Sequence, residues 1–328
     1  MTLAVFDPLY LAQVFLFSSI GLLLLAASGA PLVAVVCERL AVTHKRVFFD
    51  KLANQIATMG LVFGLGTLPF PLLVWLWGWA GNWFYLLVKH PNLELPAMSL
   101  KLAGSASLTI VAVYALALAF LAAYCGAWKS LKNSKAAHSF LGLLAATLGL
   151  LALVLFLAYK RAALHEPDLA IAGMPLQTLF IQLTATPALS LLWPTMVAAV
   201  LFALAATGGL GLVYLLMRRN TEDFGRDYYT FALRHCARWA TTPILISALA
   251  FAWGAVVHSG RLGDLTVQNP KLQYLAASIV CLLLADTSWT LVARSQTPLR
   301  QKPAVILGLL FLLLGLTALA AFFRLSVG

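Results

Sequence analysis

The chain has 328 residues, of which 62% are hydrophobic and only 10% are charged, and its mean hydropathy is +0.92. A soluble domain carries about 25% charged residues, so this composition excludes one. The formal net charge is +11, but the cations lie in short connections between apolar runs, which is typical of membrane-orientation signals and excludes a nucleic-acid partner.

Apolar runs of 20 or more residues recur along the whole chain, and each is long enough to cross a bilayer as a helix. The connection 165–193 is long and apolar, which predicts an interfacial or re-entrant segment. We therefore predict an all-α polytopic membrane protein with eight transmembrane helices, at 10–38, 52–80, 99–127, 137–160, 194–217, 230–258, 272–294 and 303–325.

Lys and Arg are distributed unequally between the two sides of these predicted spans. The connections between spans 1 and 2, 3 and 4, 5 and 6, and 7 and 8 hold fifteen of the 22: Arg39, Lys45, Arg46, Lys51, Lys129, Lys132, Lys135, Arg218, Arg219, Arg226, Arg234, Arg238, Arg294, Arg300 and Lys302. Cytoplasmic connections are enriched in these residues, so we predict that both termini lie on the extracytoplasmic side. The expected location is the inner membrane of a bacterium, as a multi-pass protein.

Two similar stretches follow spans 1 and 5. HKRVFFDK contains the pair Phe48-Phe49 and GRDYYTFA contains Tyr228-Tyr229, and the two aromatic pairs are 180 residues apart. Each pair follows a basic connection and opens the next long helix. The repetition predicts two parallel-related four-helix bundles, 1–163 and 194–328, joined by an extracytoplasmic segment at 164–193.

Small residues within the spans indicate close helix contacts. Gly60 and Gly64 form a GxxxG pattern, and the stretch TGGLG covers residues 207–211. Such residues allow helix backbones to approach each other in a membrane. We predict packing roles for them.

Asp286, in the stretch CLLLADTSWTLV, is the one acid well inside a predicted span. A carboxylate inside a membrane indicates a functional role, because its charged form is energetically costly unless it forms an ion pair or is hydrated. It predicts a proton relay or a cation site. The alternative is a structural carboxyl hydrogen-bonded to Thr287, to Ser288 or to a neighbouring helix.

None of the six histidines lies in the middle of a predicted span. His90, His165 and His258 lie on the predicted outer side, where imidazole could bind a b-type haem or a metal. The alternative is that they are polar residues at the membrane interface. The other three, His44, His138 and His235, lie at the cytoplasmic ends and are expected to sit among basic residues.

Prolines predict interrupted helices at comparable places in the two halves. Pro69 and Pro71 fall in span 2 and Pro243 falls in span 6. Paired interruptions are a sequence signal for a transporter site, which keeps a secondary transporter using Asp286 as an alternative function. The chain has no GxxxxGK[ST] or HExxH motif, and its four cysteines form no CxxC pair, so no metal or catalytic motif is present.

One combination of features resembles a known family. A first span ending in an acid (VVCERLAVTHKRVFFDKLANQIATMG) and the later stretch LVYLLMRRNTEDFGRDYYTFALRHCARWA are similar to subunit I of the cytochrome bd-type quinol oxidases. The resemblance covers nearly the whole chain and implies the plan of two four-helix bundles.

The haem ligands that the resemblance implies are missing. The histidine expected in span 1 falls at Ser19 or Ile20, within LFSSIGLLLLAASG, and the histidine of span 5 falls at Pro194 or Thr195. The methionine of span 7 falls near Ala276. The quinol-binding loop after span 6 is reduced to residues 259–271, and a ninth span is absent.

The resemblance therefore implies a haem-free, oxidase-like membrane subunit of a respiratory or electron-transfer complex, without catalytic activity of its own. It would anchor other membrane subunits and extracytoplasmic cytochrome or iron–sulfur subunits, and would contribute to a quinone or haem site at the outer face. A b-haem-binding quinol dehydrogenase subunit that uses His90, His165 or His258 is a further alternative.

Overall fold

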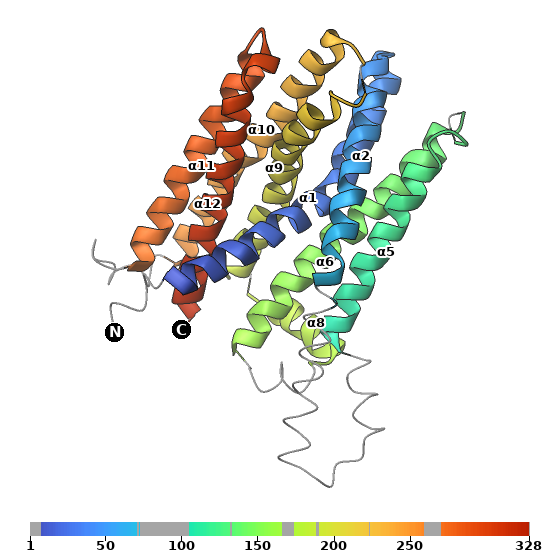
Figure 1. The fold of residues 1–328 in the computed structure, drawn as a ribbon. Helices are drawn as coiled ribbons and strands as arrows, with labels where there is room; N and C mark the ends of the chain where they lie inside the picture. The colour runs from blue at the N-terminus through green and yellow to red at the C-terminus, as the bar shows by residue number, and fades with distance from the viewer. Residues whose placement is uncertain are drawn as a thin grey trace.

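The computed structural model describes residues 8–70, 72, 105–131, 133–165, 174–187, 190–222, 224–258 and 270–327. Within these ranges the chain is almost entirely helical, and extended backbone pairs only at one isolated bridge between Ser105 and Pro175. The all-α prediction is confirmed for this part of the chain (Figure 1).

Eight long helices follow one another along the described chain, together with one short helix and one 3-10 turn. They are α1 (Pro8–His44), α2 (Val47–Thr67), α5 (Ala106–Gly126), α6 (Lys135–His165), α8 (Leu176–Ala185), α9 (Leu192–Arg218), α10 (Arg226–His258), α11 (Pro270–Arg294), η3 (Pro298–Arg300) and α12 (Lys302–Val327). Each predicted span overlaps one long helix, although α2 covers only the first part of 52–80. The short helix α8 lies within the predicted connection 165–193.

Six of the described helices are long and apolar enough to cross a bilayer. These segments are Leu11–His44, Ala106–Gly126, Lys135–Ala162, Leu192–Arg218, Lys271–Arg294 and Lys302–Phe323. The protein is therefore a helical, multi-pass membrane protein. The count of eight spans and the side on which the termini lie stay predictions.

One end of the bundle is formed by the four short connections 44–47, 126–135, 218–226 and 294–302, and we call it the basic end (Figure 1). Helix α1 begins and α12 ends at the opposite end. Gly225, in the α9–α10 connection, has φ +85°, a backbone conformation that a residue without Cβ adopts without strain. Lys45 is the one described non-glycine residue with a positive φ, at 52°.

Helix α1 is the centre of the bundle and packs against α2, α6, α9 and α12. Its buried residues join those of both halves of the chain in one hydrophobic core, which contains Leu52 of α2, Leu121 of α5, Leu212 of α9 and Trp289 of α11. The two halves thus share a core in this structure. The division at 163 and 194 stays a prediction.

The two aromatic pairs that are 180 residues apart in sequence meet at the basic end. The ring centroids of Phe48 and Tyr228 lie 5.7 Å apart in an edge-to-face arrangement, and those of Phe49 and Phe231 lie 4.8 Å apart. Edge-to-face pairs of this kind stabilise packing beyond the area that they bury. The contact joins the first turns of α2 and α10.

Glycines sit where helices approach most closely. A Cβ on Gly29 of α1 would lie 2.5 Å from the carbonyl oxygen of Ala203 in α9, and one on Gly208 would meet the backbone of α10. Gly60 faces Ala30 and Gly64 faces Leu118. The predicted packing roles of Gly60 and Gly64 and of the glycines in the TGGLG stretch are confirmed, because a Cβ at each of them would lie within 3 Å of an atom of a neighbouring helix.

The interruption expected at Pro243 is wrong, because α10 runs as one helix from Arg226 to His258 with this proline inside it. A proline removes a single backbone hydrogen bond, and the rest of a 33-residue helix keeps the others. At the corresponding place in the first half, α2 ends at Thr67, just before Pro69. Pro71 lies outside the described residues.

Candidate functional site

Asp286 lies on α11 and is buried, with 8% of its surface exposed. Its Oδ1 atom has no hydrogen-bond partner among the described residues, and no described cation forms an ion pair with it. The expected bonds to Thr287 and Ser288 are absent, because both hydroxyls donate to the carbonyl of Leu284. The structure therefore leaves this carboxyl without the partner that a charge in a membrane requires.

The three outer histidines are only partly within the described chain. His90 lies outside the described residues, and His165 and His258 are the last residues of α6 and α10, at the end opposite the basic end. The side chains of His165 and His258 also lie outside the part of the chain that the structure describes. Their binding of a haem or a metal stays a prediction, and no group of His, Cys, Asp and Glu able to hold a metal ion occurs within the described ranges.

The positions at which the resemblance places haem ligands do not fit a haem. The hydroxyl of Ser19 donates to the carbonyl of Phe15 at 2.8 Å, and that of Thr195 donates to the carbonyl of Leu191 at 2.7 Å. Each hydroxyl is thus engaged one turn back along its own helix. The side chains of Ile20, Pro194 and Ala276 have no atom able to bind iron.

A buried polar cluster lies at the basic end, around Glu38 of α1, which is fully buried. One carboxylate oxygen, Oε1, lies 2.7 Å from Nδ1 of His138 and 3.3 Å from Nζ of Lys135. The other, Oε2, accepts the hydroxyls of Tyr124 at 3.0 Å and Ser139 at 3.1 Å. A buried carboxylate requires this full set of donors, because an unpaired charge in the interior is very costly.

His138 connects this carboxylate to the backbone of α5. Its Nε2 lies 2.9 Å from the carbonyl oxygen of Tyr124, which only accepts, so Nε2 carries a hydrogen atom and donates. Its Nδ1 faces Glu38, so one further proton lies in this hydrogen bond, either on the ring or on the carboxyl group. The pair therefore holds a proton at a fixed place within the bundle.

Two carboxylates and two basic side chains meet in this cluster. Lys135 also binds Asp50 at 2.7 Å, so two carboxylates face the Lys135 ammonium and the His138 ring. The ring is enclosed by Tyr124, stacked at 4.2 Å between centroids, and by the edge-to-face ring of Trp128 at 4.8 Å. We expected His138 to sit among basic residues, and in the structure its ring contacts Glu38, Tyr124 and Trp128.

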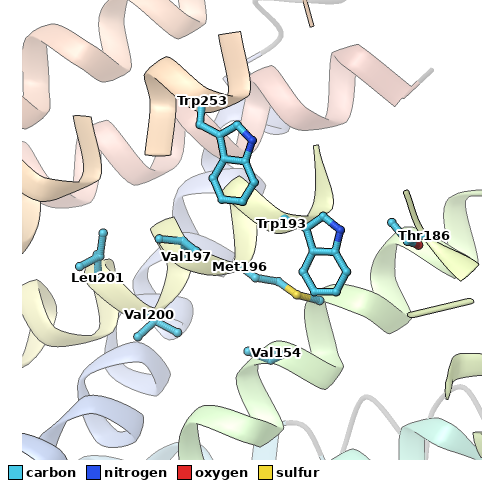
Figure 2. Close-up of a pocket in the computed structure, with 8 residues that line it drawn as sticks. All are labelled: Val154, Thr186, Trp193, Met196, Val197, Val200, Leu201 and Trp253. Carbon is cyan, nitrogen blue, oxygen red and sulfur yellow. The ribbon is translucent and has the colours of Figure 1, made fainter. Parts of the chain in front are cut away.

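Besides the polar cluster around Glu38, the structure contains an apolar pocket with a volume of about 660 Å³. Figure 2 shows its lining residues, which come from α6, α9, α10 and the residue that follows α8: Val154, Thr186, Trp193, Met196, Val197, Val200, Leu201 and Trp253. The α9 residues belong to the first turns of that helix, so the pocket lies toward the end opposite the basic end. Its size lies within the usual range of ligand pockets, about 300–1,000 Å³.

The polar group of one pocket tryptophan is already engaged. The indole N–H of Trp193 donates to the carbonyl of Pro187 at 3.1 Å, so the ring presents its apolar face to the pocket. Trp253, on α10, is 39% exposed. Walls of this kind fit a hydrocarbon chain and offer little to orient a polar substrate.

The sequence signals for these two features were weak. Glu38 was visible as the acid that ends the first span, but nothing local indicates that a histidine 100 residues later is its partner. The pocket has no motif, because its lining residues are ordinary membrane-helix residues. Comparison of the chain with protein-family models, with curated proteins and with solved structures found no match.

Proposed function

We propose that this chain is a haem-free, oxidase-like membrane subunit of an electron-transfer complex in a bacterial inner membrane, without catalytic activity of its own. It anchors membrane partners and extracytoplasmic cytochrome or iron–sulfur subunits. The proposal starts from the sequence resemblance to subunit I of the cytochrome bd-type oxidases, and the multi-pass helical architecture is compatible with it.

The observation that carries the proposal is the direct contact between α1 and α9. At Gly29 the backbones of the two helices leave no room for a side chain, and Thr207 of α9 donates to the carbonyl of Ala26 in α1 at 3.0 Å. These are the two helices on which the resemblance would place the histidine ligands. The expected ligand positions carry engaged or absent ligand atoms, and the same two helices pack tightly farther along, at Gly29 and Thr207. Together these features support a subunit that has kept the scaffold and lost the haems.

We propose in addition that the chain contributes to a quinone site at its outer face, and the apolar pocket supports this. An isoprenoid chain consists of hydrocarbon, and the pocket between Trp193 and Trp253 supplies apolar walls near the outer ends of α6 and α10. In this arrangement the tail of the quinone occupies the pocket. Its head group lies toward the outer face, where His165 and His258 end their helices and partner subunits approach.

An absorption spectrum of the purified chain, compared with that of gently solubilised membranes, tests the proposal. The isolated chain is expected to show no haem bands, whereas mild purification is expected to recover it with haem or iron–sulfur proteins. A chain that carries b or d haems by itself would contradict the haem-free assignment. A chain that always purifies without any redox protein would contradict the role in a complex.

Transport is the second candidate function, and the unpartnered Oδ1 atom of Asp286 favours it. A carboxyl of this kind could bind and release a proton or a cation during transport. In membrane vesicles, Asp286→Asn is then expected to abolish proton- or ion-coupled uptake. Asp227→Asn, at an exposed acid in the first turn of α10, serves as the control and is expected to leave uptake unchanged. Equal uptake by both variants would assign Asp286 a structural role.

A further inference from the structure

A small polar cavity at the basic end belongs to neither of the features described above. It has a volume of about 110 Å³ and lies between α2, α9 and the α9–α10 connection. Its lining residues are Lys51, Asn54, Gln55, Thr58, Tyr214, Arg218, Glu222 and Phe224. A single water needs only about 10–15 Å³, so the cavity has room for a group with several oxygen atoms.

The one described acid in the lining is already neutralised. Glu222 forms an ion pair with Arg218 through Oε1 and accepts the side-chain amide of Gln55 through Oε2 at 2.9 Å. The carbonyl of that amide accepts the hydroxyl of Tyr228 at 2.5 Å, which fixes the orientation of Gln55. The Glu222 carboxylate is therefore fully engaged, and it does not neutralise the second cation that lines the cavity.

That other cation is Lys51. Its ammonium nitrogen lies 4.5 Å from the centre of the Phe224 ring and 6.0 Å from that of Tyr228, and it forms no ion pair with any described residue. In addition, Nε of Arg218 is buried and has no hydrogen-bond partner among the described residues. The lining thus contains two cationic donors available to an anion and a net charge of +1 from Lys51, Arg218 and Glu222.

The face of α2 that lines the cavity continues as an apolar stripe. Lys51, Asn54 and Thr58 follow the i, i+3, i+7 spacing of one helix face, and Val62 and Leu65 continue that face away from the basic end. Val62 is 54% exposed and Leu65 is 53% exposed. One face of this helix is therefore cationic and polar at its start and apolar and uncovered below.

We propose that this cavity binds the phosphodiester group of an anionic phospholipid from the cytoplasmic leaflet. Lys51, Nε of Arg218 and the Asn54 amide supply the donors, and the acyl chains lie along Val62 and Leu65. Phosphate chemistry alone would also suit a free phosphate ion, but a free ion makes no use of the apolar stripe. Basic pockets between helices at the cytoplasmic side are a common form of lipid head-group site.

Native mass spectrometry of the full chain from a neutral detergent tests the proposal. Phosphatidylglycerol is titrated against phosphatidylcholine with the same acyl chains, and inorganic phosphate is tested separately by its effect on thermal unfolding. The variant is Lys51→Met, and Lys51→Arg is the conservative form. Lys129→Met, at an exposed residue of the α5–α6 connection, is the matched control.

Phosphatidylglycerol is expected to bind more tightly than phosphatidylcholine. Lys51→Met is expected to weaken its binding by about five-fold, as loss of one cation near a membrane surface should, while Lys51→Arg and Lys129→Met retain it. Equal weakening by Lys51→Met and Lys129→Met would overturn the site, and so would equal binding of the two lipids. Inorganic phosphate that stabilises the original chain but not Lys51→Met would replace the lipid by a free ion. Unfolding curves without lipid show whether each variant is folded.

Discussion

Replacement of Gly29 by alanine tests the contact between α1 and α9 on which the haem-free proposal depends. The added Cβ would lie 2.5 Å from the carbonyl oxygen of Ala203 and 2.7 Å from Oγ1 of Thr207. Ordinary van der Waals contact begins at 3.4 Å, so the two helices must separate by about 0.9 Å (3.4 minus 2.5) at this point. Neither obstacle is the far end of a flexible side chain, which leaves little scope for local adjustment.

This separation determines how much Gly29→Ala is expected to lower the free energy of unfolding. Overpacking of a well-packed interior destabilises proteins by roughly 1–3 kcal/mol. Separation also lengthens the 3.0 Å hydrogen bond from Thr207 to Ala26, although the Thr207 hydroxyl keeps its second acceptor at Ala203. We therefore expect Gly29→Ala to lower the free energy of unfolding by an amount within that range.

Helix α1 contains its own control. A Cβ on Gly21 would have no neighbouring heavy atom within 4 Å, so Gly21→Ala meets no obstacle. Alanine favours a helix over glycine by up to about 1 kcal/mol, so this variant is expected to be neutral or slightly stabilised. Unfolding of both variants in detergent, followed by circular dichroism, measures the difference. Equal stability of Gly29→Ala and Gly21→Ala would refute the close approach of α1 and α9.

Four further substitutions test the polar and aromatic interior. Glu38→Ala is expected to lower the free energy of unfolding by about 3–5 kcal/mol, because it leaves the buried donors of the cluster without their acceptor. Asp50→Ala, which removes a partly exposed ion pair, should lower it by about 0–1 kcal/mol. Asp286→Leu is expected to stabilise the fold by roughly 1–3 kcal/mol, since it removes a buried acceptor that has no partner; destabilisation would show that the carboxyl has one. Gly308→Ala should displace Trp289, and an unchanged indole emission spectrum would contradict that packing.

Helix positions could be predicted from the sequence because they depend on local composition. Long apolar runs separated by short basic connections indicated where helices begin and end, and α9 was predicted at 194–217 and observed at Leu192–Arg218. The glycines of the GxxxG and TGGLG patterns were also recognisable as packing residues. In contrast, the interruption at Pro243 was predicted incorrectly, because one missing hydrogen bond does not end a long helix in its packed context.

Which residues pair with the buried polar side chains was decided by the tertiary structure. The sequence by itself determined the membrane class and most helix boundaries, since an apolar run of sufficient length favours a membrane helix whatever its neighbours are. Only the packed bundle decided that Glu38 meets His138, that Lys51 faces the cavity beside Arg218, and that Asp286 has an oxygen atom without a partner. These contacts depend on how each helix is rotated about its axis and which helix lies beside it, and neither is specified by local composition.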